Sequence, residues 1–327
     1  MRLFPSAYGG YSQEKAVYGD EMLPNFLLIG AEKSGTTSIH NYLRAHPGVL
    51  MARVKEPLFF AFEGQSLNYK GPGDEEFNRR PVTALPDYQA LFAGSEHYAA
   101  AGESSATYLY YPQAPERAAH YVPKAKLIVI LRNPADRAYS NFLHGLRARK
   151  EHLDFGSALE AEQKRIAAGW SPFFSYKDKG WYHAQLCRWM NYYPRDQFLF
   201  FLYDDLRTRP MEVMRQIYEF IGVDPEFKPH VGVEYNVSGK PFSPRLHEFI
   251  KRNSPIHGLA RSVMPKRFRA RLKADITRWN LARPRIAPDL RSQLLAEYKP
   301  DLARLAPLIE RDLSVWNRAV ALAASNR

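Results

Sequence analysis

Three short, largely apolar runs, each followed by a polar turn and an amphipathic stretch, constrain the fold of this chain more than any other feature. The runs are Asn25–Ile29, Lys126–Leu131 and Gln197–Tyr203, with a weaker run at His97–Ala101. The amphipathic stretches cover Thr36–Arg44, Ala135–Arg149 and Met211–Ile221. Apolar strands that alternate with helices are typical of a parallel sheet covered on both faces. We therefore predict an α/β fold with a central parallel sheet flanked by helices.

The polar turns after these strands should meet at one edge of the sheet. In parallel α/β sheets, ligands bind beyond the carboxyl ends of the strands. The strand pattern puts Lys33, Glu103, Arg132 and Asp204 at that edge. This edge is therefore the expected ligand site.

The chain length of 327 residues fits a single α/β domain spanning 1–327, with additions to a common core. The expected additions are an N-terminal extension at 1–22, insertions at 63–80 and 253–288, and two C-terminal helices at 288–316. The only cysteine, Cys187, excludes an intrachain disulfide and a cysteine-based metal site. The ten histidines show no metal-ligand spacing, so we expect no metal.

The formal net charge of +12 indicates an anionic partner. Nucleic acid, an acidic membrane surface, an acidic glycan and a polyphosphate ligand all fit such a charge. Much of the excess lies between residues 261 and 285, where nine lysines and arginines accompany one acid, Asp275. That basic stretch is either a solvated helical face or a surface for an anionic acceptor or a membrane.

The first twenty residues contain no apolar core of a signal peptide. The longest apolar runs are far too short to span a bilayer. We therefore expect a cytoplasmic protein without a transmembrane segment, and peripheral membrane contact stays open. The oligomeric state is not indicated by any pattern.

The turn after the first strand has the composition of an anion-binding loop. Glycine and small polar residues from Gly30 to Ser38 lead into a helix, whose first backbone N–H groups point the same way. The hydroxyl groups add donors, and Lys33 adds a positive charge. Such turns also occur without a ligand, where the Ser and Thr residues serve only as helix caps.

This loop is not a Walker A motif. That motif has its lysine directly after the last glycine, whereas Lys33 precedes Gly35 here. The strand Lys126–Leu131 also ends in Arg132, where a nucleoside triphosphatase would need a carboxylate for Mg²⁺. The loop is therefore expected to bind phosphate groups without a metal.

Two segments resemble the sulfotransferases that use 3′-phosphoadenosine 5′-phosphosulfate (PAPS). The resemblance covers most of residues 23–250 and implies a P-loop-like three-layer fold. It assigns the 5′-phosphosulfate to Lys33, Ser34, Gly35, Thr36, Thr37 and Ser38. It assigns the 3′-phosphate to Arg132 and Ser140 within LRNPADRAYS. The spacing agrees, because Arg132 leaves a strand beside a helix start and Ser140 lies two turns along that helix.

Two further segments resemble this family less closely. Tyr203, in the run Tyr-Asp-Asp-Leu, would pack on the adenine or belong to the core. The later segment 236–240 resembles a loop that closes over the 3′-phosphate. Its implied contacts are Ser238, Gly239 and Lys240, although Lys240 could be an ordinary solvated lysine.

Lys55-Glu56-Pro57-Leu58-Phe59-Phe60 resembles a segment of the Golgi glycan sulfotransferases and their bacterial relatives. That resemblance implies that Glu56 is the general base. Lys33 is the second expected catalytic residue, because its charge can follow a developing negative charge. A partly desolvated carboxylate suits the removal of a hydroxyl proton. Alternatively, Glu56 only pairs with Lys55 or Arg53 at the surface.

The chain departs from the cytosolic phenol and steroid sulfotransferases at two points. Those enzymes follow the Thr-Thr pair with Trp, where this chain has Ser38, and they use a histidine base. His97 and His144 are less favoured candidates for such a base. The segment 102–105, which includes Glu103, matches a family strand end that lines the acceptor site.

The resulting hypothesis is in-line transfer of a sulfuryl group from PAPS to a hydroxyl, without a metal and without nucleic acid. The Glu56 segment favours a carbohydrate acceptor, while lipid, polyketide and peptide hydroxyls stay open. A P-loop-like kinase of a small hydroxylated substrate is one alternative, and it would require Mg²⁺. A non-enzymatic polyanion-binding protein is the other, and its binding would depend steeply on salt.

Overall fold

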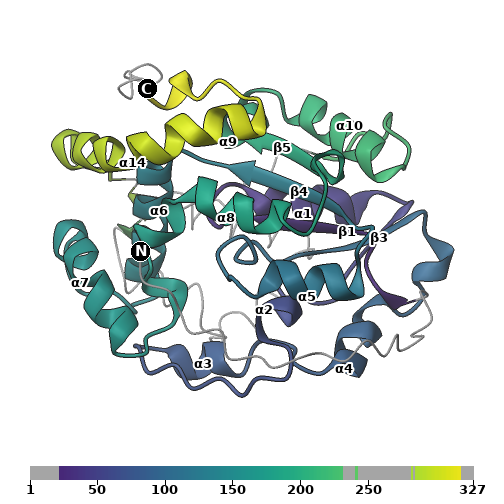
Figure 1. Cartoon of the computed structure of the whole chain (residues 1–327), viewed down its shortest axis with the longest axis horizontal. Coiled ribbons are helices and arrows are strands. Elements are labelled where there is room, and N and C mark those ends of the chain that lie inside the picture. The colour runs from purple at the N-terminus through teal and green to yellow at the C-terminus, as the bar shows by residue number, and fades with distance from the viewer. Residues whose placement is uncertain (1–21, 231–239, 242–280, 283, 318–327) are drawn as a thin grey trace, which may run out of the picture.

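The computed structural model describes residues 22–230, 240–241, 281–282 and 284–317 (Figure 1). The predictions for nearly all of the N-terminal extension, for Ser238 and Gly239, and for most of the basic stretch lie outside these residues. Among the described helices, none is long and apolar enough to cross a membrane. The single-domain organisation and the cytoplasmic location stay predictions.

A five-stranded parallel sheet forms the centre of the molecule, in the order β2-β3-β1-β4-β5. The strands are β1 (Phe26–Gly30), β2 (Val49–Met51), β3 (Ala100–Ser104), β4 (Lys126–Leu131) and β5 (Phe198–Leu202). Every residue of β1 is buried, which explains why its sequence is continuously apolar. The chain after β1 turns toward β2, and after β4 toward β5, so the topological switch point lies between β1 and β4.

Helices cover both faces of this sheet, and the predicted three-layer α/β architecture is confirmed. Alternate residues of β1 face opposite cores, with Phe26 and Leu28 in one and Leu27 and Ile29 in the other. The first core includes residues of α1 (Thr36–Ala45) and α10 (Pro210–Ile221). The second includes residues of α5 (Ala114–Tyr121), α8 (Tyr182–Met190) and α14 (Pro288–Ile309).

The remaining elements surround the carboxyl edge of the sheet or close its flanks. The helices are α2 (Phe59–Phe62), α3 (Asp74–Asn78), α4 (Leu85–Gln89), α6 (Pro134–Arg147), α7 (Phe155–Ala167) and α9 (Tyr203–Thr208). Short 3₁₀ turns include Pro172–Phe174 and Asp178–Gly180. The two-residue strands β6 (Lys240–Pro241) and β7 (Leu281–Ala282) pair antiparallel, and β6 lies against α6.

The third strand was predicted three residues too early. The predicted strand His97–Ala101 begins instead at Ala100, because Gly94 (φ 90°) starts a 3₁₀ turn at Ser95–His97. The strand then continues through Gly102, where an added Cβ would lie 2.3 Å from the Phe26 ring. The last two residues of β3 are Glu103 and Ser104, which are buried although they are polar. They interrupt the apolar pattern by which a buried strand is predicted from the sequence.

The C-terminal tail forms one long helix rather than the predicted two. Helix α14 runs through Pro300 and Pro307, and a 3₁₀ turn at Ser314–Asn317 follows it. A proline inside a helix costs about 3 kcal/mol relative to alanine. The buried stripe of α14 outweighs that cost by packing on α6 and α8, and it consists of Leu294, Tyr298, Asp301, Leu305 and Ile309.

The insertion at 63–80 is folded against the rest of the chain. Asp74 at the start of α3 is fully buried and accepts hydrogen bonds from the backbone N–H groups of Gly71 and Ser171, each at 2.8 Å. The Ser171 hydroxyl donates a third hydrogen bond to Asp74 at 2.6 Å. The insertion is therefore a fixed wall, and its position beside the carboxyl edge of the sheet matters for the site.

Candidate functional site

A cavity of about 1400 Å³ opens beyond the carboxyl ends of β1 and β4, at the switch point of the sheet. Pockets for one small ligand usually measure about 300–1,000 Å³, so this cavity has room for two substrates. The predicted site residues that line it are Lys33, Gly35, Thr36, Thr37, Ser38, Glu56, Arg132, Ser140 and Tyr203. Residues from three distant parts of the sequence therefore meet at one site.

The loop between β1 and α1 has the backbone conformation of an anion-binding turn. Lys33 (φ 68°) and Gly35 (φ 91°) both lie in the left-handed region, and Gly35 is the N-cap residue of α1. Because glycine has no side chain, no side-chain cap covers the start of α1, although the Ser38 N–H donates to the Gly35 carbonyl at 2.9 Å. An added Cβ on Gly35 would lie 2.7 Å from the Leu206 side chain and 3.2 Å from the Tyr203 ring.

Ser34 is the member of the predicted loop that does not line the cavity. Its side chain is fully buried, and its hydroxyl has no hydrogen-bond partner among the described residues. The Ser34 backbone N–H donates to the Ala31 carbonyl at 3.2 Å. A phosphate contact from Ser34 would therefore require its side chain to move.

Arg132 and Ser140 lie on the same wall of the cavity as the loop. The Arg132 guanidinium donates a hydrogen bond to the Lys33 carbonyl at 3.1 Å and stacks 4.8 Å from the centroid of the Tyr203 ring. Ser140 follows two turns along α6 and lines the same cavity. Asn133 caps α6 by accepting from the N–H groups of Ala135 and Asp136. The predicted Arg132–Ser140 arrangement is thus part of a rigid strand–helix junction.

Lys240 is the candidate about which the structure says least. Its backbone belongs to β6, which lies against α6, the helix that carries Ser140. Its side chain is not among the described parts of the chain. The Lys240 contact with the 3′-phosphate therefore stays a prediction.

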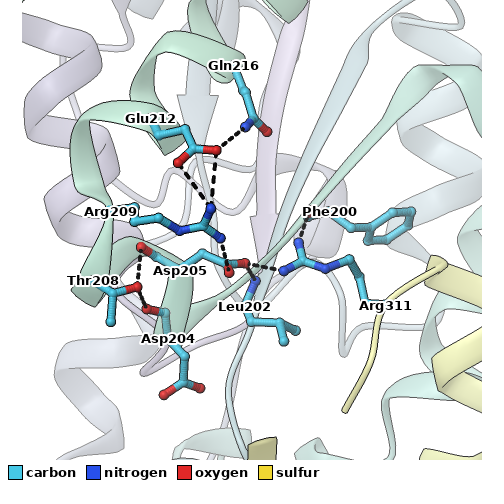
Figure 2. A network of polar contacts seen from close by, with 9 residues as sticks. All are labelled: Phe200, Leu202, Asp204, Asp205, Thr208, Arg209, Glu212, Gln216 and Arg311. Carbon is cyan, nitrogen blue, oxygen red and sulfur yellow. Dashed lines mark hydrogen bonds and ion pairs between the residues drawn. The ribbon is translucent and has the colours of Figure 1, made fainter. Parts of the chain in front are cut away.

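A polar network that includes Arg311 of the C-terminal segment holds the junction between β5 and α9 (Figure 2). Asp205 in the first turn of α9 accepts from the Leu202 N–H at 2.8 Å. Arg311 also donates to the Asp205 carboxylate, at 2.6 Å. A second hydrogen bond from Arg311 reaches the Phe200 carbonyl of β5 at 3.3 Å (Figure 2). Arg311 thereby joins the end of β5 to the start of α9, where Tyr203 begins.

Glu56 lines the cavity and is also held in ion pairs. Its carboxylate lies 2.7 Å from the Lys55 ammonium and 3.0 Å from the Arg80 guanidinium. Burial alone would raise the pKa of Glu56, but the charges of Lys55 and Arg80 outweigh it and lower the pKa. Glu56 is therefore ionised at neutral pH and ready to accept a proton. The ion-pair interpretation is thus confirmed for Lys55, with Arg80 in place of Arg53, while the role of Glu56 as general base stays a prediction.

A buried cluster around Glu103 fixes the backbone that follows Glu56. Glu103 is fully buried and accepts from the hydroxyls of Ser105 and Tyr108, each at 2.6 Å, and of Tyr88 at 3.1 Å. The Ser105 and Tyr108 oxygens in turn accept from the N–H groups of Leu58 and Phe60. These bonds hold a turn in which Glu56 (φ 58°) and Leu58 (φ 60°) adopt the left-handed conformation.

The expectation that the segment 102–105 lines the acceptor site is wrong for the described cavity. Glu103, Ser104 and Ser105 are all fully buried, and none of the segment belongs to the cavity lining. Burial raises the pKa of Glu103 to about 7, against hydrogen bonds that lower it. Glu103 thus has the greater proton affinity, but only Glu56 can meet a substrate. Asp204, placed at the same edge by the strand pattern, is also absent from the lining.

Only one of the two candidate histidines lies at the site. The side chain of His97 is 78% exposed, lies 3.3 Å from the Glu96 carboxylate and is outside the cavity. His144 on α6 lines the cavity, and its Nδ1 atom has no hydrogen-bond partner among the described residues. Burial first, and then the charge of Lys33, lower the pKa of His144 to about 3. The imidazole is therefore neutral at neutral pH.

The site contains side chains that no sequence pattern indicated. Arg80, Phe77 and Asp74 come from the insertion, and Arg291 comes from the first turn of α14. Arg291 pairs with Asp136 on α6 at 2.9 Å. The insertion and the C-terminal helix therefore complete the cavity walls.

A family of known proteins matches this chain over the same region. The family model described as "Sulfotransferase domain" matches residues 23–231. Human bifunctional heparan sulfate N-deacetylase/N-sulfotransferase 2 is 33% identical over 223 residues, which cover 66% of this chain and 23% of the human protein. The corresponding enzyme 1 of Xenopus tropicalis is 31% identical over 226 residues. The chain thus spans about a quarter of the length of these curated relatives.

A solved bacterial structure matches nearly the whole fold. A sulfotransferase from Alicyclobacillus acidocaldarius superposes with a TM-score of 0.71 at 32% sequence identity. The match covers 90% of this chain and 99% of the bacterial one. The region matched by the family model includes the loop after β1 and the segment that holds Glu56.

Proposed function

This chain belongs to the sulfotransferase domain family, and on that premise we propose that it transfers the sulfuryl group of PAPS to an acceptor hydroxyl. The observation that carries the proposal is the meeting of the loop at Lys33, the Arg132–Ser140 wall and Glu56 in one cavity. The bound donor would supply the activated sulfuryl group. A carbohydrate is the favoured acceptor.

The residues present fit such a donor. The uncapped first turn of α1 and the Lys33 ammonium suit the 5′-phosphosulfate. Arg132 uses one N–H donor on the Lys33 carbonyl, which leaves further donors of its guanidinium for the 3′-phosphate beside Ser140. The Tyr203 ring, already stacked on Arg132, offers an apolar face to the adenine.

The transfer then follows from the positions of Glu56 and Lys33. Glu56 accepts the proton of the acceptor hydroxyl, and the acceptor oxygen forms a bond to sulfur. The bond between sulfur and the bridging phosphate oxygen breaks in the same in-line displacement. Lys33 stabilises the negative charge that develops on that bridging oxygen, as a charge placed in advance in a partly desolvated site.

An amine is the second candidate acceptor, because the matched human relative is named an N-sulfotransferase. Paired sugars that differ only in carrying a free or an acetylated amine would separate the two acceptor classes. Sulfation of both sugars supports a hydroxyl acceptor. Sulfation of the free amine alone would support transfer to nitrogen.

The donor site is tested by the affinity for 3′-phosphoadenosine 5′-phosphate (PAP), the desulfonated product. We expect calorimetry in excess chelator to show tight binding to the wild type. Arg132→Ala should weaken it about 10- to 100-fold, the loss expected for hydrogen bonds to a charged group. Arg215→Ala, which removes an exposed arginine of α10, is the matched control and should bind like the wild type.

The alternatives make different predictions in the same experiment. Binding that requires Mg²⁺ would support the kinase. Binding that is equal in the Arg132 and Arg215 variants and falls steeply with salt would support the polyanion binder. The absence of PAP binding in the wild type would contradict the proposed function.

The C-terminal network in Figure 2 leads to a second prediction. Arg311→Met removes the bonds to Asp205 and to the Phe200 carbonyl and frees the turn that begins with Tyr203. We expect the Kd of PAP and the KM of PAPS to rise about 3- to 10-fold, because small displacements of a binding group lower affinity. The kcat at saturating PAPS should stay near the wild-type value.

Arg311→Lys should recover part of the affinity, because it keeps the charge opposite Asp205. Arg304→Met is the control, since Arg304 lies on the exposed side of α14. An Arg311→Met protein with unchanged PAP affinity would contradict a role in positioning Tyr203.

A further inference from the structure

The segment that carries Glu56 leads into α2 without a capping side chain of its own. The N-cap residue of this short helix is Leu58, whose side chain makes no cap hydrogen bond. The first N–H groups of a helix have no partner within the helix and need one elsewhere. Leu58 is buried, and so are Phe59 and Phe60. Because buried N–H groups are almost always paired, partners from another part of the chain are expected here.

Two hydroxyl groups from the segment that begins at the end of β3 are these partners. The Ser105 hydroxyl accepts from the Leu58 N–H at 3.2 Å. The Tyr108 hydroxyl accepts from the Phe60 N–H, also at 3.2 Å. Both hydroxyls donate their own proton to the Glu103 carboxylate, each at 2.6 Å. Ser105 and Tyr108 thus form two hydroxyl bridges between Glu103 and the start of α2.

Tyr88 joins Glu103 to the same segment by packing. Its hydroxyl donates to the Glu103 carboxylate at 3.1 Å, and its ring stacks on the Phe59 ring at a centroid distance of 4.4 Å. Glu103 accepts three hydroxyl protons in this arrangement, which fits an ionised carboxylate because that form only accepts. All three groups that bond to Glu103 therefore also contact the segment that follows Glu56.

The turn held by the two hydroxyl bridges is one that residues other than glycine avoid. Glu56 (φ 58°) and Leu58 (φ 60°) both lie in the left-handed region. Such a conformation persists only where the surrounding structure imposes it. The Glu56 N–H also donates to the Ser104 carbonyl at 3.0 Å. The Lys55 and Arg80 side chains that pair with the Glu56 carboxylate are partly exposed, and exposed ion pairs restrain a side chain weakly. The backbone therefore sets the direction of the Glu56 side chain.

We propose that Glu103 is a positioning residue: through the two hydroxyl bridges it fixes the turn at Glu56 and so aims the Glu56 carboxylate at the acceptor. The inference rests on the proposed function, which makes Glu56 the base. Without a bridge, the turn relaxes toward an ordinary φ and the carboxylate moves away from the acceptor proton. Glu103 does not line the cavity, so it acts on the reaction through Glu56 and not by contact with the reacting atoms.

The test removes the bridges one at a time. Tyr108→Phe and Ser105→Ala each delete one hydroxyl and keep the rest of the side chain. Activity is measured at saturating PAPS with the sugar that the wild type sulfates in the paired-sugar assay. We expect each kcat to fall about 10- to 100-fold, because a displacement of about 1 Å costs about 10²-fold in rate. The Kd of PAP should stay within about twofold of the wild type, since neither hydroxyl lines the cavity.

Tyr193→Phe is the matched control for the loss of a buried hydroxyl. The Tyr193 hydroxyl donates to the Val122 carbonyl at 3.2 Å and takes no part in the Glu103 cluster. Its removal should lower the melting temperature, as Tyr108→Phe does, but should leave kcat at the wild-type value. Ser105→Thr keeps a hydroxyl at the bridge and should recover part of the rate that Ser105→Ala loses.

The same replacements in the Glu56→Gln protein distinguish positioning from packing. If Tyr108 acts through Glu56, Tyr108→Phe should cost no further activity once Glu56 is an amide. Ser105→Ala provides the same comparison if Tyr108→Phe does not fold. An equal loss of kcat in both backgrounds, or wild-type kcat in both single variants, would overturn the proposal and leave Glu103 a role in the fold alone. Full activity of Glu56→Gln, or a wild type that does not bind PAP, would instead contradict the proposed function.

Discussion

Lys33→Ala is expected to lower the kcat for sulfuryl transfer by about 10²- to 10³-fold, the effect of removing one preorganised charge from a developing oxyanion. Lys33 lies in the cavity wall, and burial already lowers its pKa to about 8. Its amine therefore meets less competing water than an exposed lysine does. The loss should appear mainly in kcat, because the N–H groups of α1 and the Arg132 guanidinium continue to hold the donor.

The measurement is single-turnover transfer with saturating PAPS, together with the Kd of PAP. Lys150→Ala is the control, since Lys150 also lines the cavity but bonds to the Gly73 carbonyl on the wall formed by the insertion. Lys33→Arg should retain part of the rate, because its charge is kept but spread over a planar group. A Lys33→Ala enzyme with nearly the wild-type kcat would remove Lys33 from the mechanism.

Glu56→Gln is expected to lower kcat by about 10²- to 10⁴-fold, the usual contribution of a general base. The amide keeps the shape of the side chain but cannot accept the hydroxyl proton. Because the Glu56 carboxylate pairs with Lys55 and Arg80 and not with Arg132 or Tyr203, the Kd of PAP should stay within about threefold of the wild type. The variant thereby separates proton transfer from donor binding.

The pH profile adds a second measurement on Glu56. Lys55 and Arg80 outweigh burial and hold its pKa below the ordinary value of 4.5. The base therefore loses its function only as the pH falls through that lowered pKa, so turnover should show no acid limb from Glu56 near neutral pH. Protonation of Glu56 over the same pH range also breaks its ion pairs with Lys55 and Arg80, so the stability that these pairs contribute to the fold declines as the pH falls.

The control for Glu56 is Glu76→Gln, since Glu76 is an almost fully exposed carboxylate on α3 at the same cavity. It should turn over like the wild type. If Glu56→Gln kept full activity, the base assignment would be wrong. His144 would then be the group to replace, because it is the histidine candidate that reaches the cavity and is neutral at neutral pH.

The C-terminal segment contributes more to the donor wall than the family match suggests. The region matched by the family model ends at residue 231, yet α14 and the residues after it contact the β4–α6 and β5–α9 junctions. Arg291 pairs with Asp136, the Trp316 carbonyl accepts from Asn133, and Arg311 bonds to Asp205. The side of the cavity that carries Arg132 and Tyr203 is therefore supported by residues beyond the matched region.

The sequence by itself determined three of the five strands and the anion-binding turn, whereas β2 was not predicted and β3 was placed too early. The predicted strand at Lys126–Leu131 has the observed bounds, and the strands at Asn25–Ile29 and Gln197–Tyr203 differ by at most one residue at each end. Burial on both faces imposes a continuous apolar run, which is visible without any knowledge of neighbours. The loop from Lys33 to Ser38 was equally visible, because its glycine and its neighbouring helix are local in sequence.

The tertiary structure alone decided which charges meet. Arg80 reaches Glu56 across 24 residues, Arg311 reaches Asp205 across 106, and Lys179 reaches Glu32 across 147. Glu103 was expected at the substrate and instead is fully buried and does not line the cavity, and three hydroxyl groups donate to its carboxylate. Local patterns report how a residue relates to its own strand or helix. Ion pairs between distant segments leave no periodic trace, because only packing brings their partners together.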